Sequence, residues 1–183
     1  METLVEGTVE AALRDGPGDA VRLYVAACAE RMAPLFVGLR AGVSGREADV
    51  DLYVESVSGL WHADRPLADV AERVRLLERF PELQPHEEGI TGVADTYAFF
   101  GALGLRYALL ANGSGSADDA VSCGHAALTA MGMLDQNAVG ASFLADEQRL
   151  QSLSLSGDAA GLWDASATAG RERFRAVVGR LPR

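Results

Sequence analysis

Lysine is absent from this chain, and all 16 of its basic residues are arginines. The missing amine excludes Schiff-base catalysis and the lysine of phosphate-binding loops. It also excludes a lysine that acts as a general base. The sequence therefore rules out three kinds of catalytic or binding chemistry before any motif is considered.

Cysteine is almost as scarce, with two residues in the chain. Cys28 and Cys123 lie in apolar helical patterns, and neither has a neighbouring cysteine, so no zinc ribbon is present. We expect both to be reduced and buried in a cytoplasmic protein, and the alternative is a disulfide between them.

Long apolar stretches are also absent. Charge or glycine interrupts every apolar stretch well before about 20 residues, and the N-terminus lacks a signal-peptide pattern, so the sequence predicts neither a membrane span nor a secretory signal.

Histidine occurs three times. His86 opens a His-Glu-Glu-Gly-Ile segment that lacks the second histidine of a zinc protease, and no Glu-x-x-His pair marks a di-iron bundle. A nucleophile elbow requires a strand before the catalytic serine, and no strand is expected before Ser44. We therefore predict no catalytic residue, no metal and no cofactor. We expect His62 and His86 to be exposed to water in turns. The alternative is a metal site built from the four side chains of His62, Asp64, His86 and Glu88.

Charge is abundant but unevenly distributed. The net charge is −10, although residues 171–183 hold five arginines and one glutamate, so the rest of the chain carries −14. An acidic body disfavours nucleic acid as a partner, because phosphate binding depends on clustered basic side chains. The basic C-terminal end has apolar residues at helical spacing, and we expect it to dock on the acidic body. The alternative is a detachable helix that binds an acidic partner or a membrane surface.

Apolar residues recur at helical spacing along the whole chain, and turn signals separate helix-sized segments. Strand-like alternation is scarce, and no repeat of fixed period occurs. These patterns predict an all-α fold, with one domain over residues 1–183 arranged as an up-and-down bundle or an orthogonal array. The eight expected helices cover residues 2–14, 19–39, 46–62, 66–79, 87–111, 117–135, 141–155 and 158–181.

Local signals at three places predict how these helices begin and end. Pro34 lacks a backbone N–H, so it should kink or end the second helix. Gly113 suits a left-handed cap after the central helix. Ser116 and Asp119 form a near capping box that should open the following helix.

The most informative segment is the central helix expected over residues 87–111. It is apolar almost all the way round, which is typical of a helix in the middle of a larger helical body. Asp95 and Arg106 lie eleven residues apart, close to three full turns, so both charges fall on one stripe about 16 Å apart. The second helix is similarly apolar and carries Glu30 and Arg31. Charges on two central helices need partners.

We expect these charges to meet inside the bundle. The simpler interpretation is a structural network of ion pairs that joins the two core helices. The alternative is a polar pocket for a small acidic or amide-bearing ligand, with tyrosine hydroxyls as hydrogen-bond donors. The candidate ligand-binding residues are Glu30, Arg31, Asp95, Tyr97, Arg106, Tyr107 and His125.

Several of these segments resemble the bacterial domain-of-unknown-function 416 family. The resemblance rests on Glu-Arg-Met-Ala-Pro at 30–34, Leu-Trp at 60–61, the helix at 94–110 and Asp-Ala-Val-Ser at 119–122, and it covers residues 22–155. It implies an all-helical cytosolic fold. The family is named for its lack of a known activity, so the resemblance implies no catalytic residues.

Together, these observations predict a cytoplasmic protein without catalytic machinery. It would act by binding another protein or, as a homo-oligomer, itself. An acidic helical body steers association toward a basic partner, as an immunity-type or regulatory protein would do. The alternative is a small-molecule binder or enzyme that uses the pocket around Glu30, Arg31, Asp95 and Arg106.

Overall fold

The computed structural model describes residues 4–85, 89–136, 140 and 142–181. Over these residues the chain is all-α, as predicted, with eight α-helices, one 3-10 segment and no strand. The elements are α1 (Gly7–Asp15), α2 (Gly18–Arg40), α3 (Glu47–Leu60), α4 (Val70–Leu77), η1 (Pro81–Leu83), α5 (Val93–Ser114), α6 (Ala117–Asp135), α7 (Phe143–Leu153) and α8 (Ala159–Val178).

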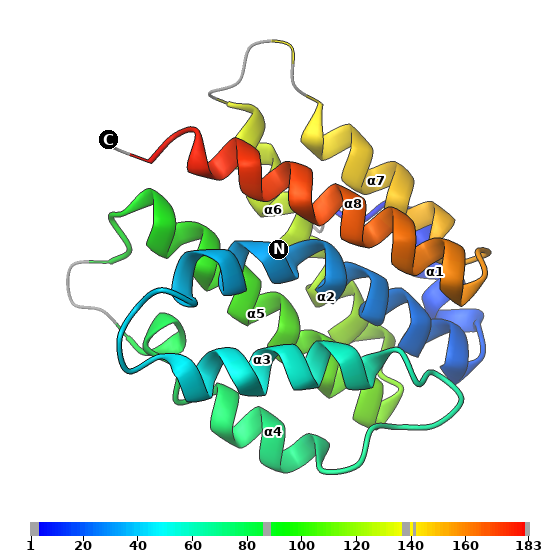
Figure 1. The fold of residues 1–183 in the computed structure, drawn as a ribbon. Coiled ribbons are helices and arrows are strands. Elements are labelled where there is room, and N and C mark those ends of the chain that lie inside the picture. Colours follow the sequence, from blue (N-terminus) through cyan, green and yellow to red (C-terminus); the bar gives the residue numbers. More distant parts are fainter. Residues whose placement is uncertain (1–3, 86–88, 137–139, 141, 182–183) are drawn as a thin grey trace.

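The arrangement places α2 and α5 at the centre of the molecule (Figure 1). In this view α8, α2 and α3 lie side by side across the front, and α5 and α6 lie behind them. Helix α2 packs against α3, α5, α6 and α8, while α5 packs mainly against α2, α6 and α4. Leu105, Ala108 and Leu109 of α5 are buried. The predicted interior position of this segment is confirmed, because a helix that is apolar all round has no face that favours water.

Aromatic side chains fill the space between these central helices and their neighbours. The ring of Phe36 in α2 stacks on Tyr53 of α3, with centroids 4.5 Å apart, and on Phe80 at 5.3 Å. All three side chains are buried. Burying a side chain of this size stabilises the fold by about 1.5–3 kcal/mol, so this stack stabilises the packing of α2 against α3 and against the segment before η1.

Pro34 does not end α2, which continues to Arg40. Gly170 of α8 lies against the same turn. A Cβ atom at position 170 would sit 3.0 Å from the Pro34 Cδ atom and 3.1 Å from the Arg31 carbonyl oxygen. Helix α8 therefore approaches α2 this closely because position 170 carries no side chain.

The turn between α5 and α6 lies two residues beyond the predicted position. Gly115, not Gly113, has the left-handed conformation, with a φ of 71°. Gly113 stays inside α5, where it packs against Val70: an added Cβ would lie 2.9 Å from the Val70 Cγ1 atom. The predicted cap of α6 is confirmed, since the Ser116 hydroxyl accepts a hydrogen bond of 3.2 Å from the Asp119 amide.

None of the helices that the structure describes is both long enough and apolar enough to cross a lipid bilayer.

Candidate functional site

A fully buried ionic cluster lies where α2, α7 and α8 meet. Arg31 of α2 forms a bidentate pair with Glu147 of α7, with Nε 2.8 Å from Oε2 and Nη2 2.9 Å from Oε1. Arg173 of α8 donates from Nη2 to the same Oε2 at 2.6 Å. We call Arg31, Glu147 and Arg173 the inner cluster. One carboxylate thus ties three helices together.

A buried glutamine links the inner cluster to α6. Gln151 donates through Nε2 to Glu147 Oε1 at 2.8 Å and to the Gly124 carbonyl at 3.0 Å. Its own Oε1 accepts a hydrogen bond of 2.9 Å from the Tyr24 hydroxyl. Both Gln151 and Tyr24 are buried, so the network satisfies polar groups that water does not reach.

The remaining donors of Arg31 are also occupied. Its Nη1 atom lies 3.3 Å from the hydroxyls of Ser154 and Ser166, and its Nη2 atom lies 3.2 Å from the Cys28 sulfur. Cys28 and Cys123 are both free and buried, as predicted. Arg31 therefore makes contacts that hold the fold, and it lines none of the described hollows.

The inner cluster stays ionised despite its burial. Burial opposes the charge of Glu147, but the positive charges of Arg31 and Arg173 outweigh it and lower its pKa to about 2. Burial also disfavours the charge of Arg31, but Glu147 raises its pKa. For Arg173, burial together with the nearby Arg31 lowers the pKa. Electrostatic attraction to one carboxylate thus holds two buried cations.

Two arginines and one glutamate leave the inner cluster with one surplus positive charge. The Nη1 atom of Arg173 is buried without a hydrogen-bond partner. Arg173 also lines a hollow of about 600 Å³ between α7 and α8, which Asp146, Asp164 and Glu172 line as well. Arg173 is thus the member of the inner cluster that reaches a surface hollow.

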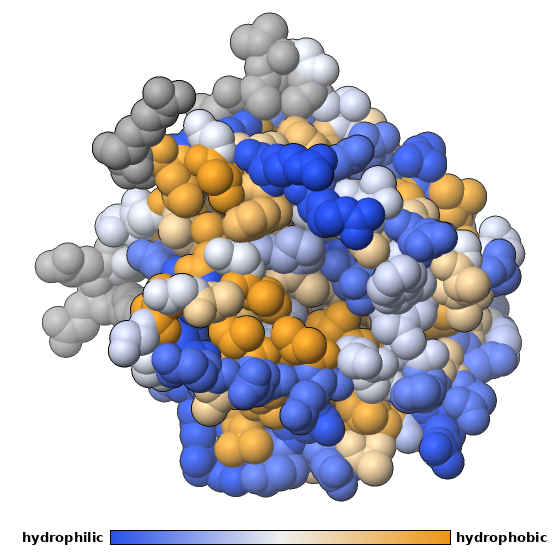
Figure 2. All heavy atoms as spheres, viewed as in Figure 1, coloured by the Kyte–Doolittle hydropathy of each residue, from blue (hydrophilic) through white to orange (hydrophobic). Residues whose placement is uncertain are grey.

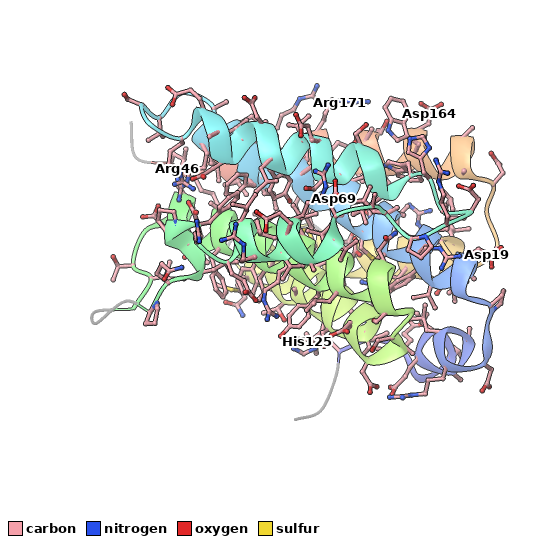
Figure 3. All side chains as sticks on the ribbon, turned by 90° about the horizontal axis from the view of Figure 1, so that it is seen from below. Asp19, Arg46, Asp69, His125, Asp164 and Arg171 are labelled. Carbon is pink, nitrogen blue, oxygen red and sulfur yellow. The ribbon has the colours of Figure 1, made fainter. Side chains whose placement is uncertain are left out.

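A second cluster lies at the C-terminal end of α2 and reaches the surface. Glu82 accepts from Arg40 Nε at 2.5 Å, and from Arg46 Nη1 at 2.9 Å and Nη2 at 2.6 Å. Arg40 also donates to Asp95 Oδ1 at 2.7 Å, although the Asp95 side chain is 64% exposed. We call Arg40, Arg46, Glu82 and Asp95 the outer cluster; Figure 3 labels Arg46 beside the start of α3. Burial alone would raise the pKa of Glu82, but the hydrogen bonds from Arg46 and Arg40 outweigh the effect of burial, so the pKa of Glu82 is lowered.

The remaining predicted residues occupy separate surroundings. Glu30 Oε2 accepts a hydrogen bond of 3.0 Å from the indole nitrogen of Trp61. Arg106 pairs with Glu78 at 2.8 Å, and its guanidinium lies 5.6 Å from the ring centroid of Tyr107. The Arg106 side chain is 31% exposed. It therefore meets a surface carboxylate and not Asp95.

Tyr97 and His125 also have partners of their own. The Tyr97 hydroxyl accepts a weak hydrogen bond of 3.4 Å from Arg180, which also donates to the Leu134 carbonyl. The His125 Nδ1 atom accepts a hydrogen bond of 3.1 Å from the Leu4 amide, and Figure 3 labels His125 on the side of the molecule opposite α3. The structure thus does not bring the predicted charges together inside the bundle. Its closest counterpart is the Arg40–Asp95 pair, which does join α2 to α5.

Glu147 was not predicted as a site residue from the sequence. Arg173 was counted only among the arginines of the basic C-terminal end. Both positions carry a periodic signal. Glu147 lies three residues before the buried Leu150 and Arg173 four before the buried Val177, on the same helical faces. A charge in the apolar stripe of an amphipathic helix is the pattern that would have identified them.

A surface groove with a largely apolar lining lies beside the central helices. It lies over α2 between α3 and α8, and has a volume of about 510 Å³. We call it the α3–α8 groove. Figure 2 shows apolar residues gathered between α8 and α3, with hydrophilic residues along both edges. Its lining comprises Glu30, Ala33, Val37, Tyr53, Val54, Val57, Ser58, Trp61, His62 and Trp163.

Metal ligation has no geometric support in the described part of the chain, where no three His, Cys, Asp or Glu side chains converge. His62 lines the α3–α8 groove. His86 and Glu88, which entered the alternative metal site, lie outside the described residues.

Comparisons with protein-family models, with curated proteins and with solved structures found no match to this chain.

Proposed function

We propose that this protein acts by binding another polypeptide, with the α3–α8 groove as its docking surface. The observation that carries the proposal is the exposure of large apolar side chains on both edges of the groove. Val54 of α3 is 49% exposed and Trp163 of α8 is 48% exposed. Apolar side chains gathered at a groove lose unfavourable contact with water when a partner covers them.

Trp61 and Trp163 line the groove, and tryptophan is one of the residues that contribute most binding energy at protein interfaces. Tryptophan is enriched among residues that dominate binding energy, because it buries a large rigid area and keeps a polar N–H. The hydrogen bond from Trp61 to Glu30 fixes the indole at one end of the groove. A fixed ring loses little conformational freedom when a partner packs against it.

The four charged residues of the predicted ligand pocket favour a docking surface over that pocket. Glu30, Asp95 and Arg106 line three different hollows, and Arg31 lines none of those described. Each of these side chains already has a partner within the protein. A pocket for a small acidic ligand would need unpaired donors that converge on one cavity. The net charge of −10 instead supports steering toward a complementary protein surface.

A photo-crosslinking amino acid at position 54 tests the proposal in the cells that produce the protein. A captured polypeptide is identified by mass spectrometry and purified, and its dissociation constant is measured by calorimetry. We expect Trp163→Ala to weaken the purified complex at least about tenfold, since truncating an interface anchor removes 1 kcal/mol or more.

The matched control is Leu153→Ala on α7. Leu153 is 44% exposed, but it lines the hollow between α7 and α8. It should leave the affinity unchanged. The proposal fails if position 54 captures no polypeptide, or if Trp163→Ala and Leu153→Ala weaken the complex equally.

A further inference from the structure

Short side chains on α8 leave room between this helix and α7, which lie side by side in Figure 1. Ala165 and Ala169 line the hollow between the two helices, and their side chains end at Cβ. The hollow has a volume of about 600 Å³, and sites for small molecules typically measure about 300–1,000 Å³. It therefore has the size of a small-molecule site, and it is separate from the α3–α8 groove.

Arg173 is the buried cation of this hollow. It lies four residues after Ala169, on the same face of α8, and it is 1% exposed. Its Nη2 atom donates to Glu147, whereas its Nη1 atom has no hydrogen-bond partner within the described part of the chain. Burying a guanidinium N–H without an acceptor costs free energy. This donor and the surplus charge of the inner cluster together favour an acceptor that is negatively charged.

The rim of the hollow carries the opposite charge. Asp164, Thr168 and Glu172 follow one another at four-residue spacing on α8, line the hollow and are all exposed. They lie one position before Ala165, Ala169 and Arg173, which are less exposed. On α8 the hollow therefore has an acidic outer stripe and an inner stripe that ends at the buried arginine.

The neighbouring arginines leave the two carboxylates of this outer stripe unpaired. Arg149 of α7 lies 3.8 Å from Asp146. Arg171, which is not part of the lining, donates to the Thr168 hydroxyl at 3.0 Å. Neither arginine forms an ion pair with the outer-stripe carboxylates among the residues that the structure describes. Both carboxylates are therefore available to a positively charged group.

We propose that the hollow between α7 and α8 binds a small zwitterion, in which a short apolar chain joins a carboxylate to a protonated amine. The carboxylate accepts a hydrogen bond from Arg173 Nη1, and the amine lies at the rim with Asp164 and Glu172. Leu150 and Leu153 also line the hollow and contact the apolar chain. A simple anion is disfavoured by the acidic rim and a simple cation by the buried arginine.

Titrations of the full-length, isotopically labelled chain followed by NMR test the inference with three compounds that share one carbon chain. These are 6-aminohexanoate, hexanoate and hexylamine. We expect 6-aminohexanoate to bind with a dissociation constant below about 1 mM, and each compound with a single charge to bind at least about tenfold more weakly. The backbone signals that shift should belong to α7 and α8. The side-chain Nε–H signal of Arg173 should shift with them, because the carboxylate approaches its guanidinium.

Two variants test the position of the ligand. Ala169→Leu fills the hollow and should weaken the binding of 6-aminohexanoate at least about tenfold; its matched control is Ala145→Leu, at an exposed alanine of α7 outside the lining. Glu172→Gln should weaken the binding of 6-aminohexanoate but not that of hexanoate. Its matched control is Glu55→Gln, at a side chain of α3 that is 70% exposed. Both controls should bind like the natural chain.

Three results would overturn the inference. The first is a natural chain that does not bind 6-aminohexanoate, which would leave water as the occupant of the hollow. The second is hexanoate binding as tightly as 6-aminohexanoate. The third is unchanged binding in Glu172→Gln, an exposed position at which the variant should fold even if Ala169→Leu does not. None of these results bears on the α3–α8 groove, so the proposed docking function stands or fails separately.

Discussion

The inner and outer clusters contain the same arrangement, a glutamate held between two arginines, the inner one at the middle of α2 and the outer one at its C-terminal end. In the inner cluster the side chains of Glu147 and Arg31 are 0% exposed. In the outer cluster the Glu82 side chain is 3% exposed, but Arg40 and Arg46 keep 10% and 13% and Asp95 keeps 64%. The two clusters therefore differ in how much water reaches their arginine side chains.

That difference determines what each cluster contributes. Removing two arginines and a glutamate from water is expensive, and the ion pairs of the inner cluster repay the cost only while all the partners are present. The outer cations keep partial hydration and a second carboxylate. We therefore expect the inner cluster to be intolerant of single changes and the outer cluster to lose stability in small steps.

The largest effect should come from Glu147→Ala. It leaves Arg31 and Arg173 buried without a counter-charge, so we expect the free energy of unfolding to fall by about 3–5 kcal/mol. Urea denaturation followed by circular dichroism measures the change, and Glu147→Gln provides a milder variant of similar size. The triple variant Arg31→Met, Glu147→Leu, Arg173→Met should retain the stability of the natural chain to within about 1 kcal/mol, or exceed it. A loss below 1 kcal/mol for Glu147→Ala would contradict the buried role of this carboxylate.

Acid should weaken the inner cluster over a defined range of pH. The pKa of Glu147 is lowered in the folded protein from 4.5 to about 2, so its stabilisation is complete above the unfolded value. It is lost as pH falls from about 4.5 toward 2, by about 3 kcal/mol in all. Urea denaturation at a series of pH values measures the slope, and Glu147→Gln should flatten it. An unchanged slope in that variant would assign the acid sensitivity to other carboxylates.

Glu82→Gln should have a smaller effect than Glu147→Ala. Arg40 keeps its bond to Asp95, and Arg46 keeps a 2.7 Å bond to Asp49. Since both cations retain a carboxylate, we expect a loss of about 1–3 kcal/mol in urea denaturation. An equal loss for the Glu82 and Glu147 variants would remove the distinction between the clusters.

The smallest effect should come from Asp95→Asn. Its side chain is mostly exposed, so the pair with Arg40 contributes at most about 1 kcal/mol. In 1 M NaCl, where the screening length is about 3 Å, the difference from the natural chain should disappear. Unfolding of both proteins at low and high salt tests this. A difference that survives high salt would show that Asp95 acts through geometry and not through charge.

The helices could be predicted from the sequence because their signals are local. Apolar spacing marked each helix, and Ser116 marked the cap of α6. Both ends of the central helix were predicted wrongly. At its C-terminal end Gly113 stays helical and packs on Val70, a contact between residues distant in the chain. At its N-terminal end α5 starts at Val93 and not at residue 87, and the backbone of Gly92 before it is extended.

The partners of the charged residues could not be predicted in the same way. Arg31 was singled out correctly as a charge on a central helix, but Glu147 lies 116 residues away in the chain. Asp146 and Glu147 are neighbours on α7. Which of them enters the core depends on how that helix is turned against α2 and α8, and no local pattern of charges specifies this.

The sequence by itself determined that this protein is helical and that two nearly uniform apolar helices occupy its centre, because hydrophobic periodicity acts within one helix. The tertiary structure alone decided which carboxylate each arginine meets and which apolar residues stay exposed between α3 and α8. Those outcomes depend on the packing of helices distant in the chain, since a charge pairs with whatever lies within a few ångströms of it.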